Sequence, residues 1–202
     1  FTDFSRMPPS VHQTFPLYLH DALPISNAVI TYSFGVSGTP KGIVISHRNL
    51  INSARVAAQY LKIQEDDVIS GLLIFNLDYG LNQIFSSIYK RATLALHRFI
   101  LPEDFLNHVI DDKVTVIPLM PINLTQIFDE DMHRIPSPEL FENVKTITSS
   151  GGKVTKKMVS DCKGLFKISN FFSIHGLTEA FRSAYLDPSQ IESRPDSIEK
   201  AI

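Results

Sequence analysis

A glycine-rich stretch between residues 31 and 42 carries the groups best suited to holding phosphate. Its sequence, TYSFGVSGTPKG, places three glycines, several hydroxyl groups and one lysine between two apolar runs. Gly35 and Gly38 can adopt positive φ, so that successive backbone N–H groups point into one concavity that binds phosphate oxygens. The further donors in the stretch are Ser33, Ser37, Thr39 and Lys41.

The spacing in this stretch differs from that of a Walker loop. A Walker loop has the pattern Gly-x-x-x-x-Gly-Lys-Ser/Thr and opens a helix. Here Pro40 stands at the place of the second glycine, Gly42 replaces the Ser/Thr, and a β-branched run follows. The stretch is therefore either a phosphate-binding loop of another kind or a structural turn between two strands.

The stretch HGLTEA, residues 175–180, combines groups suited to a nucleotide and its metal ion. Glu179 provides a carboxylate, and Mg²⁺ prefers one or two carboxylates together with phosphate oxygens. Thr178 can donate to a phosphate, and the ring of His175 can stack on a planar group. The alternative interpretation is a helix start with an exposed glutamate.

Two other polar stretches follow apolar runs. In SSGGK, residues 149–153, the absence of side chains at Gly151 and Gly152 lets a planar ring lie against the backbone, although a plain tight turn has the same pattern. In FNLDYGLNQ, residues 75–83, aromatic and amide side chains can line an apolar pocket. The alternative for this last stretch is a helix cap with Asp78 near the N-terminus.

Short apolar runs alternate with segments of helical periodicity from residue 27 onward. We predict strands at 28–33, 42–46, 68–75, 92–96, 114–119, 144–149 and 166–172. We predict helices at 46–61, 79–90, 102–112, 122–128 and 155–164. This alternation predicts an α/β fold, a mostly parallel sheet flanked by helices. Because ligands bind beyond the carboxyl ends of parallel strands, we expect the polar stretches to form one composite site.

Composition excludes several classes of function. The chain has 202 residues, 44% of them hydrophobic and 20% charged, with a formal net charge of -2, which gives no reason to expect nucleic acid as a partner. No window reaches the roughly 20 consecutive apolar residues of a membrane span. Cys162 is the only cysteine, so no internal disulfide can form, which is typical of a cytoplasmic protein. We expect Cys162 to be a small buried hydrophobic residue.

The first 26 residues differ from the remainder in having four prolines and little periodicity. They do not resemble a secretory signal, because no basic start leads into an apolar run. The segment LHDALPIS, residues 19–26, resembles the translation of a common DNA-sequencing adapter. We therefore interpret residues 1–26 as an artefact or a poorly packed arm, and residues 27–202 as a partial domain; a native N-terminal arm is the alternative.

Taken in order, the four stretches resemble the superfamily of adenylate-forming enzymes, which includes acyl-CoA synthetases, aryl-CoA ligases, luciferases and peptide-synthetase adenylation domains. The glycine-rich stretch and the following IVISHRNL are similar to the family's phosphate loop. FNLDYG is similar to the segment that shapes the acyl pocket, SSGG to the glycine pair beside adenine, and HGLTEA to a Tyr-Gly-x-Thr-Glu motif. LTEAFRSAYLDP and LDYGLNQ look most like bacterial acyl-CoA ligases of exopolysaccharide and exosortase gene clusters.

This resemblance implies a ligase that joins ATP to a carboxylic acid and passes the acyl group from acyl-AMP to the thiol of coenzyme A or a carrier protein. The implied nucleotide-binding residues are Ser33, Gly35, Ser37, Gly38, Thr39, Lys41, Gly151, Gly152, His175, Gly176 and Thr178. The implied catalytic residues are Lys41, Thr178 and Glu179, and Glu179 would also hold Mg²⁺. The implied acyl-pocket residues are Phe75, Asp78, Tyr79 and Gly80.

The chain departs from the family pattern at several positions. Phe34 and Val36 replace hydroxyl residues of the loop, and each lost donor would cost about 1–3 kcal/mol if it left a phosphate oxygen unpaired. His175 replaces a tyrosine, Lys153 a small residue and Glu199 a glycine. Sequencing errors would explain these changes equally well.

The family's sequences continue past the point that matches Ile202, with a ribose-binding aspartate, a hinge and a small domain that carries a catalytic lysine. We therefore expect the chain to be the central part of such an enzyme and to be inactive by itself. Two alternatives stay open: the adenylation domain of a peptide synthetase, and a nucleotide-binding remnant that has lost catalysis.

Overall fold

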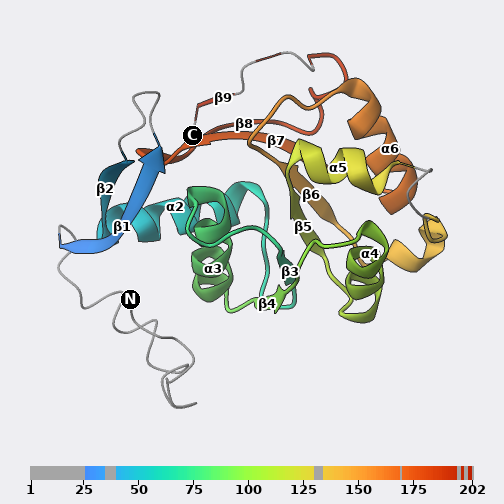
Figure 1. Ribbon diagram of the computed structural model, residues 1–202, viewed down its shortest axis with the longest axis horizontal. Coiled ribbons are helices and arrows are strands. Elements are labelled where there is room, and N and C mark those ends of the chain that lie inside the picture. Colours follow the sequence, from blue (N-terminus) through green and yellow to red (C-terminus); the bar gives the residue numbers. More distant parts are fainter. Residues whose placement is uncertain are drawn as a thin grey trace.

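The computed structural model describes residues 26–34, 40–129, 134–168, 170–194, 197 and 200–201. The described strands form one seven-stranded sheet and a separate two-stranded sheet (Figure 1). The two-stranded sheet pairs β1 (Asn27–Phe34) with β2 (Pro40–Ser46) in antiparallel orientation. It confirms the strand–loop–strand arrangement expected around the glycine-rich stretch.

The large sheet has the strand order β4-β3-β5-β6-β7-β8-β9. Its parallel strands are β3 (Val68–Gly71), β4 (Thr93–Leu96), β5 (Val116–Leu119), β6 (Thr146–Ser149) and β7 (Asn170–Leu177). Two antiparallel strands complete it, β8 (Ala180–Leu186) and β9 (Lys200–Ala201). The predicted α/β fold with a mostly parallel sheet is confirmed.

Helices cover both faces of this sheet. The elements on one side are α2 (His47–Tyr60) and α3 (Asp78–Lys90). Those on the other are α4 (Pro102–Asp111), α5 (Pro121–Ile127), the short 3₁₀ helix η3 (Pro138–Phe141) and α6 (Lys156–Phe166). Figure 1 shows the two groups on either side of the strands. Each group buries its own apolar cluster, the larger one under α4, α5 and α6.

Local sequence explains the helix starts. The Ser46 hydroxyl accepts a hydrogen bond from the backbone N–H of Asn49 at 3.3 Å, as an N-cap does. Leu50, Ala54 and Ala57, which recur at helical spacing, are buried. Pro102 begins α4 and is followed by two acidic residues, which suit the positive end of the helix dipole. No helix of the described part of the chain has the length and apolar character to cross a membrane.

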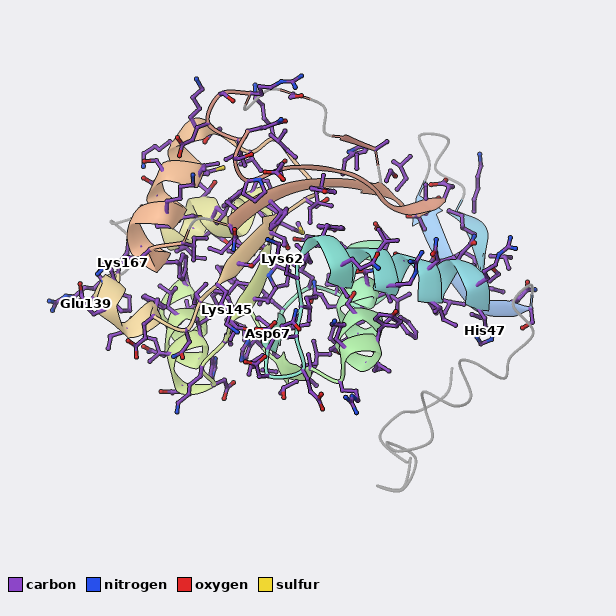
Figure 2. All side chains as sticks on the ribbon, turned by 180° about the vertical axis from the view of Figure 1, so that it is seen from behind. His47, Lys62, Asp67, Glu139, Lys145 and Lys167 are labelled. Carbon is purple, nitrogen blue, oxygen red and sulfur yellow. The ribbon has the colours of Figure 1, made fainter. Side chains whose placement is uncertain are left out.

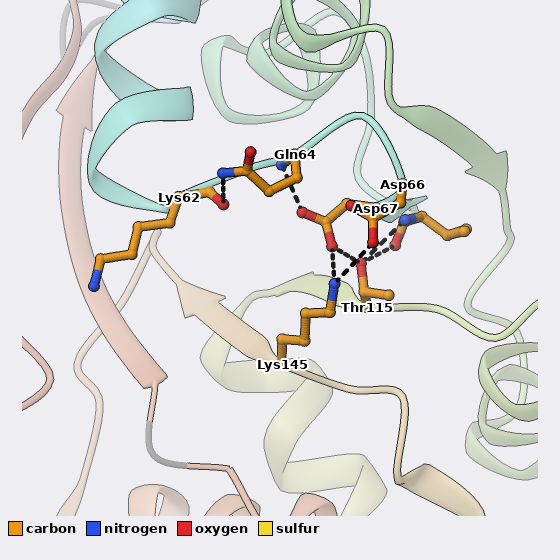
Figure 3. Close-up of polar contacts among 7 residues, drawn as sticks. Lys62, Gln64, Asp66, Asp67, Thr115 and Lys145 are labelled. Atoms are coloured by element: carbon orange, nitrogen blue, oxygen red, sulfur yellow. Dashed lines mark hydrogen bonds and ion pairs between the residues drawn. The ribbon is translucent and has the colours of Figure 1, made fainter.

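A cluster around the buried Asp67 joins the amino ends of three parallel strands (Figure 3). Asp67 precedes β3, Thr115 precedes β5 and Lys145 precedes β6. The Asp67 carboxylate accepts hydrogen bonds from the Thr115 hydroxyl, the Lys145 ammonium and the Gln64 backbone N–H, each at 2.8 Å. The cluster therefore fixes the strands at the end opposite to their carboxyl edge.

The long dimension of the molecule separates the small sheet from α6. Figure 2 shows His47 beside the β1–β2 hairpin at one end, and Glu139 and Lys167 at the other. The Lys167 ammonium lies 2.8 Å from a Glu139 carboxylate oxygen and links η3 to the end of α6. The Lys167 hydrogen bond lowers the pKa of Glu139 to about 2.

Three predicted element boundaries are wrong. The strand expected at 68–75 stops at Gly71, because its edge partner β4 is also only four residues long. Helix α6 continues past Gly164 to Phe166, because Leu165 and Phe166 bury their side chains in the core. The strand expected at 166–172 is displaced, since Phe166 ends the helix and β7 begins at Asn170.

Candidate functional site

Two of the glycine-bearing stretches lie at the carboxyl edge of the large sheet. Strands β6 and β7 are parallel neighbours, with Ser149 paired to Ser173. Gly151 follows the end of β6 by two residues, and His175 lies two residues beyond Ser173 on β7. The register therefore carries both residues to the same edge, as the strand–loop pattern predicted.

The backbone around Gly151 and Gly152 lies against the start of α5. Gly151 has φ +84°, a conformation that strains any L side chain, and a Cβ added at Gly152 would approach the Cγ of Pro121 to 3.3 Å. Both glycines are exposed. A planar ring can therefore lie along this backbone, where a side chain would stand in its way.

Ser149 ends β6, two residues before the glycine pair. It is fully buried, and its hydroxyl has no hydrogen-bond partner within the described part of the chain. Buried polar atoms are nearly always paired, so a donor or acceptor from a ligand or water is needed here. Sequence reasoning missed Ser149 because a serine inside a predicted strand carries no distinguishing signal.

The HGLTEA stretch is the end of β7 and a hairpin turn into β8. His175 and Gly176 belong to β7, and Thr178 and Glu179 form the turn. The alternative of a helix start is therefore wrong, because the chain continues as an antiparallel strand. His175 and Glu179 are exposed and Thr178 is half-buried, so all three can be reached by a ligand.

A metal ion at this turn would depend on Glu179 together with oxygens from a ligand. The described residues contain no group of three or more His, Cys, Asp and Glu side chains that could enclose a metal ion. Mg²⁺ does not need such a cage, because it commonly binds through one or two carboxylates, phosphate oxygens and water. A single exposed carboxylate fits that coordination.

The predicted acyl-pocket segment is anchored to the strand that carries the glycine pair. The buried Tyr79 of α3 shares a hydrogen bond of 2.5 Å with the Thr148 hydroxyl of β6. Phe75 and Asp78 are half-buried. Asp78 is the first residue of α3 but forms no side-chain cap, because Leu77 occupies the N-cap position.

Gly80 has a structural role that the sequence did not reveal. A Cβ at Gly80 would lie 2.1 Å from the carbonyl oxygen of Ile74. Only glycine permits the first turn of α3 to approach the preceding loop so closely. The close contact packs the loop that carries Phe75 against the first turn of α3, which carries Tyr79.

The glycine-rich stretch belongs to the small sheet and not to the large one. Ser33 and Lys41 are cross-strand partners of β1 and β2, Ser33 half-buried and Lys41 exposed. Gly35, Ser37, Gly38 and Thr39 lie outside the described residues. The meeting of this stretch with Gly151 and Glu179 thus stays a prediction.

Cys162 has the structural role that was expected. It is buried in the larger apolar cluster, and burial raises the pKa of its thiol. A thiol held in its neutral form is a poor nucleophile, so Cys162 takes no part in the site.

Comparison with known proteins identifies one enzyme family over most of the chain. The sequence profile described as AMP-binding enzyme matches residues 12–202. The match begins within the segment that we interpret as an arm, so the boundary at residue 27 stays a prediction.

Individual relatives include ligases and synthetases. The 2-succinylbenzoate–CoA ligase of Bacillus licheniformis is 27% identical over 156 residues, which are 77% of this chain and 30% of that protein. Surfactin synthase subunit 2 of Bacillus subtilis is 25% identical over 161 residues, 76% of this chain and 4% of that protein. The solved structure of O-succinylbenzoate coenzyme A synthetase from Bacillus subtilis with AMP has a TM-score of 0.75 at 26% identity, covering 89% of this chain and 36% of that one. The chain spans well under half of each.

Proposed function

The chain belongs to the AMP-binding enzyme family, and from this membership we propose that the protein containing it is an ATP-dependent acid–thiol ligase. In this proposal a carboxylate attacks the α-phosphorus of ATP, the bond to the β-phosphate oxygen breaks, and acyl-AMP and pyrophosphate form. The thiol of coenzyme A then displaces AMP. The observation that carries the proposal is the family match over residues 12–202, and likeness to two CoA-dependent relatives supports the choice of acceptor.

The carboxyl edge of the large sheet would hold the AMP portion. Gly151 and Gly152 would lie along the adenine, and the exposed ring of His175 would stack on it. Gly176, which has no side chain, would leave space for the nucleotide beside that ring. The Thr178 hydroxyl would donate to the α-phosphate. Glu179 would hold Mg²⁺, which neutralises phosphate charge when bound.

The glycine-rich stretch would hold the departing phosphates. Backbone N–H groups and the Lys41 ammonium would offset negative charge as pyrophosphate leaves. The residues in this role are Ser33, Gly35, Ser37, Gly38, Thr39 and Lys41. The acid would bind beside α3, against Phe75, Asp78, Tyr79 and Gly80.

Acid-dependent exchange of pyrophosphate into ATP tests the proposal in the protein that contains this chain. We expect exchange in the presence of a cognate acid, and a loss of at least about tenfold in Glu179→Gln, since Glu179 would hold the Mg²⁺ that neutralises phosphate charge. Glu103→Gln, which removes an exposed carboxylate from α4, is the matched control and should exchange normally. AMP binding without exchange would instead support the inactive remnant suggested by Phe34 and Val36.

A second candidate is an adenylation domain of a peptide synthetase, which the likeness to surfactin synthase subunit 2 supports. The two candidates differ in their acceptor thiol. Formation of a free acyl-CoA thioester from added coenzyme A supports the first candidate. Transfer only to a phosphopantetheine-bearing carrier protein supports the second. Either would work in the cytoplasm, which we infer from the single cysteine.

A further inference from the structure

A pocket of about 600 Å³ opens on the α2 side of the large sheet, away from the candidate site. The last turn of α2, the first residues of β7 and the end of β8 form its walls. Phe172 and Tyr185 reach it from the sheet face that packs on α2, whereas His175, one residue beyond Ile174, points to the opposite face. The volume lies within the ~300–1,000 Å³ typical of small-molecule sites.

An aromatic platform forms one side of this pocket. The rings of Tyr60 and Tyr185 are stacked, with centroids 4.4 Å apart and planes 8° apart. Phe172 packs against both rings at 5.8 and 5.9 Å. Because these rings hold one another in place, a planar ligand can stack on them at little cost in side-chain entropy.

Three of the four charged side chains at the pocket have polar partners within the fold. The Lys163 ammonium lies 2.6 Å from the Glu192 carboxylate. The Asp187 carboxylate accepts hydrogen bonds from the backbone N–H and the hydroxyl of Ser189, at 2.9 and 2.6 Å. The Lys163–Glu192 pair is neutral, and Asp187 keeps its negative charge while one of its oxygens is occupied by the Ser189 donors.

Lys62 is the exception. Within the described part of the chain it forms no ion pair. Figure 3 shows its side chain directed away from Asp66, Asp67 and Lys145. Its backbone is fixed, with φ 55° and its N–H donated to the Gln59 carbonyl at 3.1 Å, and its exposed side chain belongs to the pocket lining.

From the stacked rings and this uncompensated lysine, we propose that the pocket binds a small planar aromatic molecule carrying one anionic group. The ring stacks on an outer face of the Tyr60–Tyr185 pair, and the anion pairs with Lys62. The site is separate from the proposed adenylate site and does not depend on that function.

Benzenesulfonate and its neutral analogue benzenesulfonamide test this proposal with the 202-residue chain, by ligand-observed NMR. Benzenesulfonate should bind, and the sulfonamide should bind about fivefold more weakly, the effect of one partly exposed ion pair. Lys62→Met should remove that difference. Lys113→Met is the matched control, because Lys113 also follows a helix with positive φ, at 52°, and lies far along the chain on the end of α4.

The aromatic contribution is tested at Tyr185. Tyr185→Phe keeps the ring and should bind as the parent chain does, whereas Tyr185→Leu should bind about tenfold more weakly. Circular dichroism shows whether each variant folds, and Lys62→Met remains decisive if Tyr185→Leu does not. Equal binding by Lys62→Met and Lys113→Met, or binding lost in His175→Ala and kept in Tyr185→Leu, would overturn the proposal.

Discussion

Asp67 is a buried carboxylate that lies away from the candidate site, at the amino ends of the parallel strands. Its side chain is 4% exposed and accepts hydrogen bonds from three elements. Asp67→Asn keeps the shape but removes the charge and turns one acceptor into a donor facing Lys145 or Thr115. We expect the free energy of unfolding to fall by about 1–3 kcal/mol, measured by urea denaturation. Asp66→Asn, on the exposed neighbour, should change it by less than about 0.5 kcal/mol.

The same carboxylate predicts how stability depends on pH. Burial by itself raises the pKa of Asp67, but hydrogen bonds from Lys145, Gln64 and Thr115 outweigh it and leave the pKa below the ordinary 3.8. Because the folded pKa is the lower one, this stabilisation is complete above the unfolded value and is lost as pH falls through the folded value.

The difference in unfolding free energy between the parent chain and Asp67→Asn should therefore be constant near neutral pH and shrink below pH 3.8. Urea titrations at a series of pH values measure it. A difference that persists unchanged under strongly acidic conditions would show that Asp67 acts through its hydrogen-bond acceptors and not through its charge.

Residue types and strand order predicted that Gly151 and His175 lie at the same edge of the sheet, and the register of β6 and β7 confirms that placement. The binding roles of Gly151, Thr178 and Glu179 stay predictions. Thr148 and Ser149 could not be predicted, since a hydroxyl inside a buried strand shows its partner only once the register is known.

At the scale of elements, periodic segments were predicted well and their ends were not. α2 and α3 match the predicted spans within two residues because their buried positions recur at helical spacing. The end of α6 was misjudged because Gly164 was taken as a stop signal. Burial of Leu165 and Phe166 outweighs the low helix propensity of that glycine, and Lys167 ends the helix in the left-handed conformation instead.

The two structural glycines of α3 and α6 should respond in opposite ways to alanine. Gly164 is exposed within a helix and an added Cβ meets nothing within 4 Å, so Gly164→Ala should stabilise by about 0.5–1 kcal/mol. Gly80→Ala places a Cβ 2.1 Å from the Ile74 carbonyl oxygen and should cost about 1–3 kcal/mol. Thermal denaturation measures both. A stabilising Gly80→Ala would mean that the loop before α3 moves freely.

At the scale of the whole molecule, the sequence predicted the fold class but not the division into two sheets. Alternating strands and helices imply a parallel sheet, and β3 to β7 form one. Nothing in the β1 and β2 sequences distinguishes strands that join that sheet from strands that pair only with each other. The proposed function requires that both sheets contact the same nucleotide.

Nucleotide binding to the 202-residue chain can test that union of the two sheets. If Lys41 approaches the phosphates of a nucleotide whose adenine lies on Gly152, Lys41→Met should weaken ATP binding about tenfold and leave adenosine binding unchanged. Gly152→Val should weaken both, because its side chain would fill the space beside Pro121 where the ring lies. Lys90→Met, at the end of α3, is the control for loss of a half-buried lysine elsewhere in the fold. Isothermal titration measures the binding of ATP and of adenosine to the parent chain and to the three variants. Equal ATP affinity in Lys41→Met and Lys90→Met would mean that Lys41 of the small sheet does not bind phosphate. The phosphates would then bind to groups at the carboxyl edge of the large sheet.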